Sequence, residues 1–292
     1  MNQRKRVRTI ETILKSKRYE SLFALRAFET ILRKKRGYVI ARPKPDVPAI
    51  LLMSGGLDSI CIGFYLLKRY NVPIYPLYIR WDQKNLLKEE EAVRYFSELF
   101  TAQFPKLFHN LFVVDAPIPA RALQLHDDVS YYALPLSLRN SIFLTHAVHY
   151  ANYLEKVEHE HIRTIYINSI ANDSLMCPDA SLTAIRAANI NLCFNEGDFS
   201  WQYTSIALER TLGMYKNKDY FIRYASKYHL PIEKTWSCET EKLIHCGECK
   251  TCHNRKDGFA QAGIPDKTIY YTPGIVKRIM SKMKKIIKNT IY

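Results

Sequence analysis

The feature that most constrains the fold is a short apolar run that ends in a glycine-rich turn. Residues 48–53, PAILLM, have the length and composition of a buried strand, and residues 60–70, ICIGFYLLKRY, are typical of a helix. The turn SGGLDS, residues 54–59, joins them. Two adjacent glycines bring backbone N–H groups close to an anion, and the positive end of the following helix points to the same place. The segment therefore predicts a phosphate-binding turn.

The side chains of this turn suit a nucleotide. Ser54 and Ser59 can donate hydrogen bonds to phosphate oxygens, and Asp58 can orient Mg²⁺ or position the nucleotide. The lysine of a Walker A loop is missing, so the chemistry differs from that of Walker A proteins. For so short a motif the alternative is a plain strand-to-helix connection. The expected nucleotide-binding residues are Ser54, Gly55, Gly56, Leu57, Asp58 and Ser59.

Strand-like and helix-like segments continue to alternate after the turn, which predicts a Rossmann-like α/β fold with a parallel sheet and helices on both faces. Ligands of such sheets bind at the carboxyl ends of the strands, where SGGLDS falls. The predicted strands cover residues 48–53, 72–79, 111–114 and 164–169, and the predicted helices cover 60–70, 88–104 and 140–156.

Four cysteines near the carboxyl end form a second pattern, C-x7-C-x2-C-x2-C. Four thiolates complete a tetrahedral zinc shell, and this tight spacing suits a knuckle of turns. With four protein ligands no position stays open for water, so we expect a structural Zn²⁺ site. An iron–sulfur cluster is the alternative, because four thiolates serve it equally well. The predicted ligands are Cys238, Cys246, Cys249 and Cys252, whereas Cys61 and Cys193 are expected to pack as small apolar groups.

The net charge of +15 is concentrated at the two ends. Residues 1–44 hold 14 basic and 3 acidic residues, and residues 267–292 hold 7 basic and none acidic. The slightly acidic body between them favours a small-molecule substrate and makes a nucleic-acid partner unlikely. Both basic ends have helical apolar spacing, so each could bind an acidic partner or simply pack on the body. The apolar runs are too short for a membrane span, and no secretory pattern follows the start, so we expect a cytoplasmic protein.

These observations divide the chain into four parts. Residues 1–47 are a basic helical extension with a proline-rich linker, and residues 48–235 are the nucleotide-binding α/β domain. Residues 236–270 carry the metal site, and residues 271–292 form a basic C-terminal helix.

SGGLDS after a buried strand resembles the PP-loop family of ATP pyrophosphatases, which implies ATP and Mg²⁺. Together with WSC…CGECKTCHNRKDGFAQAGIPDKT, it resembles the QueC family of 7-cyano-7-deazaguanine synthases over residues 48–270. LPLSLRNSIFLTHAVHYA and NDSLMCPDA resemble two further segments of that family. On this resemblance the catalytic residues are Asp58, Lys218 and Arg139, and the substrate-binding residues are Gln83, Lys84, Arg139, Asn140, Asp173 and Asp179.

The resemblance implies that ATP adenylates the carboxylate of 7-carboxy-7-deazaguanine, and that ammonia then gives the amide and finally the nitrile, preQ0. Two departures lie on the substrate side: Lys84 and Asn85 stand where the family has Arg and His, and the YPDC loop has become Cys177 to Ala180. Relatives in antiviral operons attach the deazaguanine to a protein amine, and the basic N-terminal extension would suit docking of such a partner. The alternatives are a PP-loop enzyme that modifies tRNA and a non-catalytic nucleotide-binding protein. The family also suggests a homodimer.

Overall fold

The computed structural model describes residues 3–118, 138–175 and 177–272, with side chains described from residue 9 and not for residue 175. Within these ranges five strands form one parallel sheet in the order β3-β2-β1-β4-β5. The order reverses direction at β1, which is the switch point where ligands bind in open α/β sheets. The strands are β1 (Ala49–Leu52), β2 (Ile74–Arg80), β3 (Phe112–Asp115), β4 (Thr164–Tyr166) and β5 (Gln202–Thr204).

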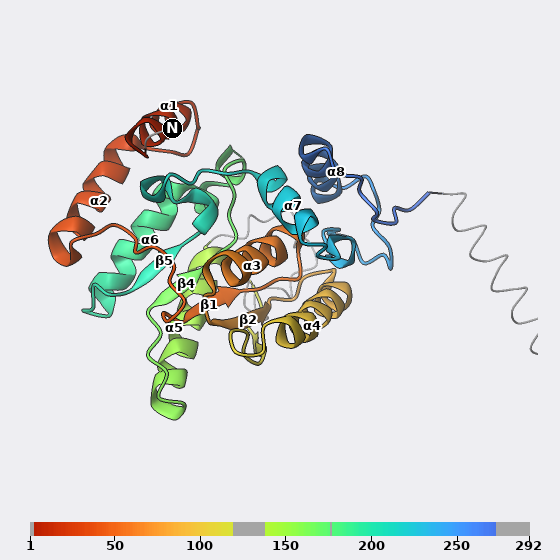
Figure 1. Cartoon of the computed structure of the whole chain (residues 1–292), viewed down its shortest axis with the longest axis horizontal. Coiled ribbons are helices and arrows are strands. Elements are labelled where there is room, and N and C mark those ends of the chain that lie inside the picture. The colour runs from red at the N-terminus through yellow and green to blue at the C-terminus, as the bar shows by residue number, and fades with distance from the viewer. Residues whose placement is uncertain (1–2, 119–137, 176, 273–292) are drawn as a thin grey trace, which may run out of the picture.

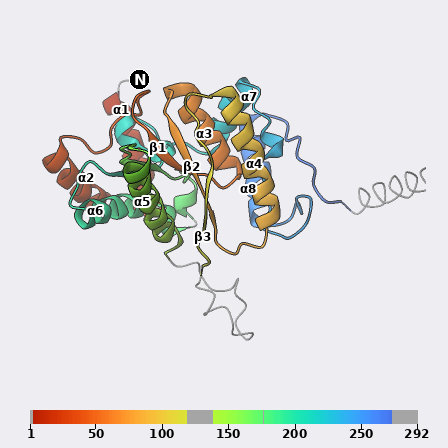
Figure 2. The same ribbon diagram turned by 90° about the horizontal axis from the view of Figure 1, so that it is seen from below.

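Helices cover both faces of the sheet, as the sequence predicts (Figures 1 and 2). Alternate residues of β1 point to opposite faces, so Ile50 joins one hydrophobic cluster while Ala49 and Leu51 join the other. On the Ile50 face lie α5 (Arg139–Val157) and α6 (Leu182–Asn195). On the Leu51 face lie α3 (Leu57–Tyr70), α4 (Leu86–Gln103), α7 (Lys218–Lys227) and α8 (Lys250–Ala262).

Two N-terminal helices, α1 (Gln3–Lys15) and α2 (Leu22–Arg36), precede the sheet. Ser21 caps the start of α2 by accepting a hydrogen bond from the Ala24 N–H, and Gly37 ends it in the left-handed conformation. α2 lies along α6, and its Leu25 and Leu32 are fully buried in the cluster that contains β1 and α5. The helical spacing expected for this segment is confirmed, and its apolar face contributes to the main core.

Three features of the remaining chain bear on the sequence predictions. Cys61 and Cys193 are buried among apolar side chains, as expected. No helix in the described part of the chain is long and apolar enough to cross a membrane. The predicted C-terminal helix, residues 271–292, falls almost wholly outside the described residues, and the four-part division of the chain stays a prediction.

Candidate active site

A cavity of about 670 Å³ opens at the carboxyl ends of β1, β2 and β4. It is lined by residues at or just after the ends of these strands, by the first turns of α5 and α7, and by one face of α8 from Lys250 to Gln261. Parallel strands place their carboxyl ends at one edge, so groups far apart in the sequence converge here. Polar lining residues include Ser54, Glu89, Arg139, Asn140, Asn168, Asp173, Asn217, Lys218, Lys250 and Asp257.

The turn between β1 and α3 has the shape of a phosphate cradle. Gly55 adopts a φ of +69°, and a Cβ there would lie 2.9 Å from both the Glu89 carbonyl oxygen and the Val93 nitrogen of α4. Only glycine fits a left-handed backbone pressed this closely against a helix. Ser59 Oγ accepts a hydrogen bond from Ser54 N at 3.2 Å and donates one to Gly56 O at 3.0 Å, which closes the turn. The hydrogen bonds of Ser59 therefore connect the two ends of the turn formed by the six residues that are expected to bind the nucleotide.

An ion pair connects this turn to α7. Lys218 Nζ lies 2.8 Å from Asp58 Oδ2, and both side chains are mostly buried. Gly258 of α8 makes room for the lysine, because a Cβ at Gly258 would lie 2.6 Å from Lys218 Cδ. The structure thus brings Asp58 and Lys218, 160 residues apart, into direct contact. Lys218 lines the cavity, whereas of the residues 54–59 it is Ser54 that does so.

A third carboxyl group, that of Asp173, lies in the same electrostatic environment. Burial and the neighbouring negative charge of Asp58 raise the pKa of Asp173 to about 6, while Lys218 and Arg139 act in the opposite direction. The Ile170 N–H donates to Asp173 Oδ2 at 3.0 Å and holds the carboxyl group in place. A raised carboxyl pKa beside fixed cations in a cavity is typical of functional sites.

Several cavity side chains keep polar atoms without a protein partner. Among the described residues, Arg139 Nε, Asn168 Oδ1 and Asn217 Oδ1 are buried and make no hydrogen bond. Each residue lines the cavity. Because a buried polar group without a partner is costly, these atoms are positioned to be satisfied by a bound ligand. Together they offer one donor and two acceptors.

Glu89 adds a buried carboxyl group on the α4 side of the cavity. Gln83 Nε2 donates to Glu89 Oε1 and to Tyr78 Oη, both at 2.9 Å, and Asn85 Nδ2 donates to Glu89 Oε2 at 3.3 Å. Burial raises the pKa of Glu89 to about 7, against the effect of these hydrogen bonds. Gln83, a predicted substrate residue, therefore supports the cavity through Glu89, whereas the neighbouring Lys84 is exposed and is not part of the wall.

The predicted residues of the 139–140 and 173–179 segments are only partly brought together. Asn140 lines the cavity, and its Nδ2 donates to the main-chain oxygen of Asp179 at 3.3 Å. Asp179 itself is not among the lining residues, but Cys177 and Ala180 are. The roles expected for these residues, as for the other predicted site residues, stay predictions, and Lys84 and Asp179 lie outside the cavity lining.

The four predicted metal ligands gather in one place. The sulfur atoms of Cys238, Cys246, Cys249 and Cys252 all lie within 4.8 Å of one another, with 3.9 Å between Cys246 Sγ and Cys252 Sγ and 4.0 Å between Cys249 Sγ and Cys238 Sγ. Four sulfurs around one tetrahedral ion at about 2.3 Å stand roughly 3.8 Å apart, so the cluster fits a single metal ion.

Backbone and hydroxyl donors surround these sulfurs. Cys246 N approaches Cys238 Sγ at 3.3 Å and Cys249 N approaches Cys246 Sγ at 3.2 Å. Burial disfavours the thiolate of Cys249, but hydrogen bonds, chiefly from Thr251, lower its pKa to about 6. Groups that stabilise thiolates are the expected outer partners of a metal.

The cysteine cluster is attached to the phosphate turn. The Trp236 N–H donates to Gly55 O at 3.0 Å, and Asn85 Nδ2 donates to Cys238 O at 2.9 Å. α8 starts directly after Cys249, contains Cys252 and presents Lys250, Thr251 and Asn254 to the cavity. The sequence predicts only turns here, whereas the last two ligands bracket the first turn of a helix. A metal at this cluster would hold one wall of the cavity against the turn.

The sheet order, the glycine turn at its switch point and the cysteine cluster define a PP-loop α/β protein with a four-cysteine metal site. The sequence model of the family described as "Queuosine biosynthesis protein QueC" matches residues 48–263, and the chain belongs to that family.

Relatives resemble the chain over most of its length. A 7-cyano-7-deazaguanine synthase from Methanothrix thermoacetophila is 29% identical over 231 residues, which are 76% of this chain and 98% of that protein. One from Nautilia profundicola is 29% identical over 76% of this chain and 97% of that protein. Among solved structures, the U34-tRNA thiolase NcsA from Methanococcus maripaludis with its 4Fe-4S cluster is 14% identical, covers 85% of this chain and 91% of that one, and has a TM-score of 0.32. A similarity at that level carries no functional argument.

Several polar cavity residues were not predicted from the sequence, among them Glu89, Asn168, Asn217, Lys250 and Asp257. Asn168 follows β4 at its carboxyl end, a position that could have marked it, and Asn217 directly precedes Lys218. Glu89 lies in the run Glu89–Glu91, which resembles a solvated helix face, and Lys250 sits between two cysteines. Periodicity alone cannot show that these side chains face the cavity.

The close packing of Gly55 gives a first prediction, with Gly197 as a matched control. Both residues have a positive φ, but a Cβ at Gly197 would meet nothing within 4 Å. We expect Gly197→Ala to lower the free energy of unfolding by about 1 kcal/mol, the cost of left-handed backbone. Gly55→Ala should cost at least about 2 kcal/mol more, because the new methyl group collides with the α4 backbone. Urea denaturation measures both, and equal losses would contradict this packing.

The raised pKa of Asp173 gives a second prediction. A carboxyl group whose pKa rises on folding, here from 3.8 to about 6, stabilises the fold below its unfolded pKa and loses that contribution as the pH rises through its folded pKa. Asp173→Asn should therefore raise the free energy of unfolding at about pH 8 and leave it nearly unchanged near pH 4. Urea denaturation at both pH values checks this, with the exposed Asp46→Asn as control. A gain that is equal at both pH values would exclude this electrostatic origin.

Proposed function

We propose that the chain is an ATP-dependent carbon–nitrogen ligase that adenylates the carboxylate of a 7-deazaguanine and passes the acyl group to an amine. The observation that carries the proposal is that Ser54 of the glycine turn, Lys218 with its ion-pair partner Asp58, and Arg139 meet at one cavity at the switch point of the sheet. Membership of the QueC family and the names of its relatives supply the substrate class.

The proposed reaction has two chemical steps, the first at the α-phosphorus of ATP and the second at the carboxyl carbon of the substrate. A carboxylate oxygen of the substrate attacks the α-phosphorus of ATP, and pyrophosphate leaves. An amine then attacks the activated carbon, AMP leaves, and the amine loses a proton to give an amide. For a nitrile product, the amide oxygen attacks the α-phosphorus of a second ATP and pyrophosphate leaves; loss of AMP and of both N–H protons then gives the carbon–nitrogen triple bond.

Each residue near the turn has a role in this scheme. The N–H groups of Gly55, Gly56 and Leu57 would hold phosphate oxygens, because they lie at the start of α3, where the positive end of the helix favours an anion. Lys218 and Arg139 would offset negative charge that develops on the phosphates and the carboxylate. Asp58 would hold Mg²⁺ on the nucleotide, and the ion-paired lysine beside it would be kept extended toward the turn.

The substrate base would occupy the part of the cavity beside Asn140, Asp173 and Glu89. A guanine-like edge offers N–H donors, and the unpartnered amide oxygens of Asn168 and Asn217 are acceptors of the kind that such an edge needs. Gln83 would act through Glu89, which it orients.

The acceptor amine is either ammonia or a protein amine. Lys84 and Asn85 stand at the family's Arg and His positions, the Cys177–Ala180 loop is altered, and the N-terminal segment lies outside the region that the family model matches. These differences favour an acceptor or a product that differs from that of the synthases. A protein amine would give a deazaguanine–protein conjugate.

For the cysteine cluster we propose a structural zinc ion. Sulfur separations near 4 Å fit one shared ion, whereas four thiolates that each bind a separate iron of a cubane cluster must stand further apart. All four ligands come from the protein, so this ion would hold the wall of the cavity and take no part in the chemistry. Its thiolate ligands suit a reducing compartment such as the cytoplasm.

Turnover tests the enzymatic proposal. Asp58→Ala and Lys218→Ala should each lower ATP-dependent release of AMP and pyrophosphate by about 10²–10³-fold, because each removes charge placed for the transition state. Lys227→Ala, at the exposed end of the same helix as Lys218, should change the rate less than about twofold. If all three variants match the unaltered chain, the site is elsewhere.

Mass spectrometry of the same reactions with carboxydeazaguanine and ammonia identifies the product. A nitrile indicates an ordinary synthase, and amide alone, or mass added to a supplied protein, indicates conjugation. A chain that modifies tRNA would leave the free base unchanged, and a non-catalytic nucleotide-binding protein would release neither AMP nor pyrophosphate.

The metal proposal is tested by elemental analysis of the purified chain. We expect about one zinc per chain, little iron and no acid-labile sulfide. Cys246→Ser should lose the zinc and much of the folding stability, since binding to such sites contributes on the order of 10 kcal/mol. Cys177→Ser, outside the cluster, should keep it. Iron with sulfide in place of zinc would contradict the proposal.

A further inference from the structure

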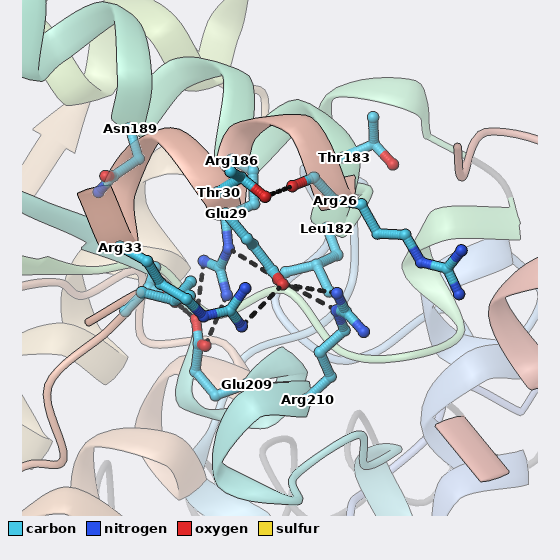
Figure 3. Close-up of polar contacts among 12 residues, drawn as sticks. Arg26, Glu29, Thr30, Arg33, Leu182, Thr183, Arg186, Asn189, Glu209 and Arg210 are labelled. Atoms are coloured by element: carbon cyan, nitrogen blue, oxygen red, sulfur yellow. Dashed lines mark hydrogen bonds and ion pairs between the residues drawn. The ribbon is translucent and has the colours of Figure 1, made fainter. Parts of the chain in front are cut away.

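The N-terminal segment, residues 3–47, contributes carboxylates to the interior of the body. Glu29 of α2 is fully buried, although it lies in a segment with a large excess of basic residues. Arg210 Nε and Nη2 donate to the two oxygens of Glu29 at 3.0 and 2.5 Å, and Arg186 Nε lies 3.6 Å from Glu29 Oε1. Figure 3 shows Glu29 between these two arginines. The extension is thus joined to the body by a buried ion cluster.

The body cannot neutralise this cluster by itself. Arg186 has its own carboxylate, because it binds both oxygens of Glu209 at 3.1 and 2.7 Å. Arg210 does not: in the part of the chain that the structure describes, the carboxylates paired with it are Glu29 and Glu11, both from the N-terminal segment. Removing one partner of a buried pair leaves an uncompensated charge and is strongly destabilising. Arg210 is therefore held where it is by residues outside the family-matched region.

A second carboxylate from the segment caps α6. Glu20 accepts hydrogen bonds from Leu182 N at 2.8 Å, from Thr183 N at 2.9 Å and from Thr183 Oγ1 at 2.7 Å. A carboxylate at a helix start satisfies N–H groups and favours the positive end of the helix. Glu20 therefore fixes the residues at which the 171–181 loop enters α6.

The residues that these carboxylates bind belong to, or adjoin, two loops that line the cavity. The 171–181 loop, which ends at the Glu20 contact, presents Asp173 and Cys177 to the cavity. The 205–217 loop contains Glu209 and Arg210 and ends at Asn217, which is followed by Lys218 at the start of α7. Asn217 and Lys218 both line the cavity. The loops are also joined to each other, because Ala171 N donates to Lys216 O at 2.9 Å.

We propose that Glu20 and Glu29 are positioning residues, which hold the two cavity loops, 171–181 and 205–217, in fixed positions relative to the turn of residues 54–59. The N-terminal segment is then a clamp on the active site, and its contribution to catalysis passes through the orientation of Asp173 and Lys218. This catalytic consequence rests on the proposed function, whereas the clamp on the loops does not.

Hydrogen–deuterium exchange of the full chain tests the clamp without any turnover. Glu29→Gln should raise exchange in the 205–217 loop by about tenfold or more while α4 stays unchanged, because only local opening becomes easier. Glu20→Gln should do the same in residues 171–184. Glu98→Gln, an exposed charge change on α4, is the matched control and should alter none of these segments. General destabilisation would raise exchange throughout the sheet.

Turnover of the same variants separates this inference from the function on which it rests. Glu29→Gln should lower kcat for pyrophosphate release by about tenfold per folded chain, with the KM for ATP changed less than about threefold, because Lys218 acts mainly on developing charge. If the unaltered chain turns over ATP and both variants match it in exchange and kcat, the clamp is refuted. An inactive unaltered chain with local loop opening in the variants refutes the function and keeps the clamp. If Glu29→Gln does not fold, hydrogen–deuterium exchange and kcat of Glu20→Gln alone decide whether the clamp exists.

Discussion

The rest of the structure depends on the contact between Gly55 and α4. β1 lies at the switch point of the sheet, so the turn that follows it is where a ligand can bind, and Gly55 lets this turn press against the α4 backbone. The same residue accepts a hydrogen bond from Trp236, which brings the cysteine segment to the turn. Because one residue joins the strand, a helix and the metal segment, the position of the phosphate cradle is fixed from several sides.

Two devices, placed at opposite sides of the cavity, support this centre. On one side the four cysteines shape α8, whose first turn lines the cavity. On the other side the buried ion cluster of Glu29, Arg186, Glu209 and Arg210 joins the N-terminal helices to the loop that ends at Lys218 (Figure 3). Neither device needs to touch the substrate. The first holds the α8 side of the cavity, and the second holds the loop that leads to Asn217 and Lys218. Polar groups held in fixed positions are what preorganised charge stabilisation requires.

Much of the fold and of the candidate site could be predicted from local patterns. The run from residue 48 to residue 70 identifies strand, turn and helix by length, glycine content and periodicity, and the cysteine spacing identifies a metal site. α6 and β5 were not predicted. α6 buries Arg186 and Asn189 beside its leucines, so no clean apolar stripe marks it, and β5 has only three residues. Their identity depends on tertiary partners that the local sequence does not contain.

The same limit applies to charge. Counting residues describes the N-terminal segment as a basic end, and the few acids among its many arginines and lysines attract no attention. In the structure, however, Glu20 and Glu29 bind the body through short hydrogen bonds, while most of the described basic side chains of the segment face solvent. Burial decides which charged side chains of the segment pair with the body. Which side chains are buried follows from the way α2 lies on α6. The net charge of a segment bears on its solubility and its partners, but it does not reveal internal ion pairs of this kind.

The most direct test of the central claim is a crystal structure of the chain with a non-hydrolysable ATP analogue and Mg²⁺. We predict that the phosphates lie against the N–H groups of residues 55–57, with Lys218 turned toward them and the adenine in the cavity between β1 and β4. An analogue bound away from that turn, with residues 54–59 unchanged and empty, would contradict it.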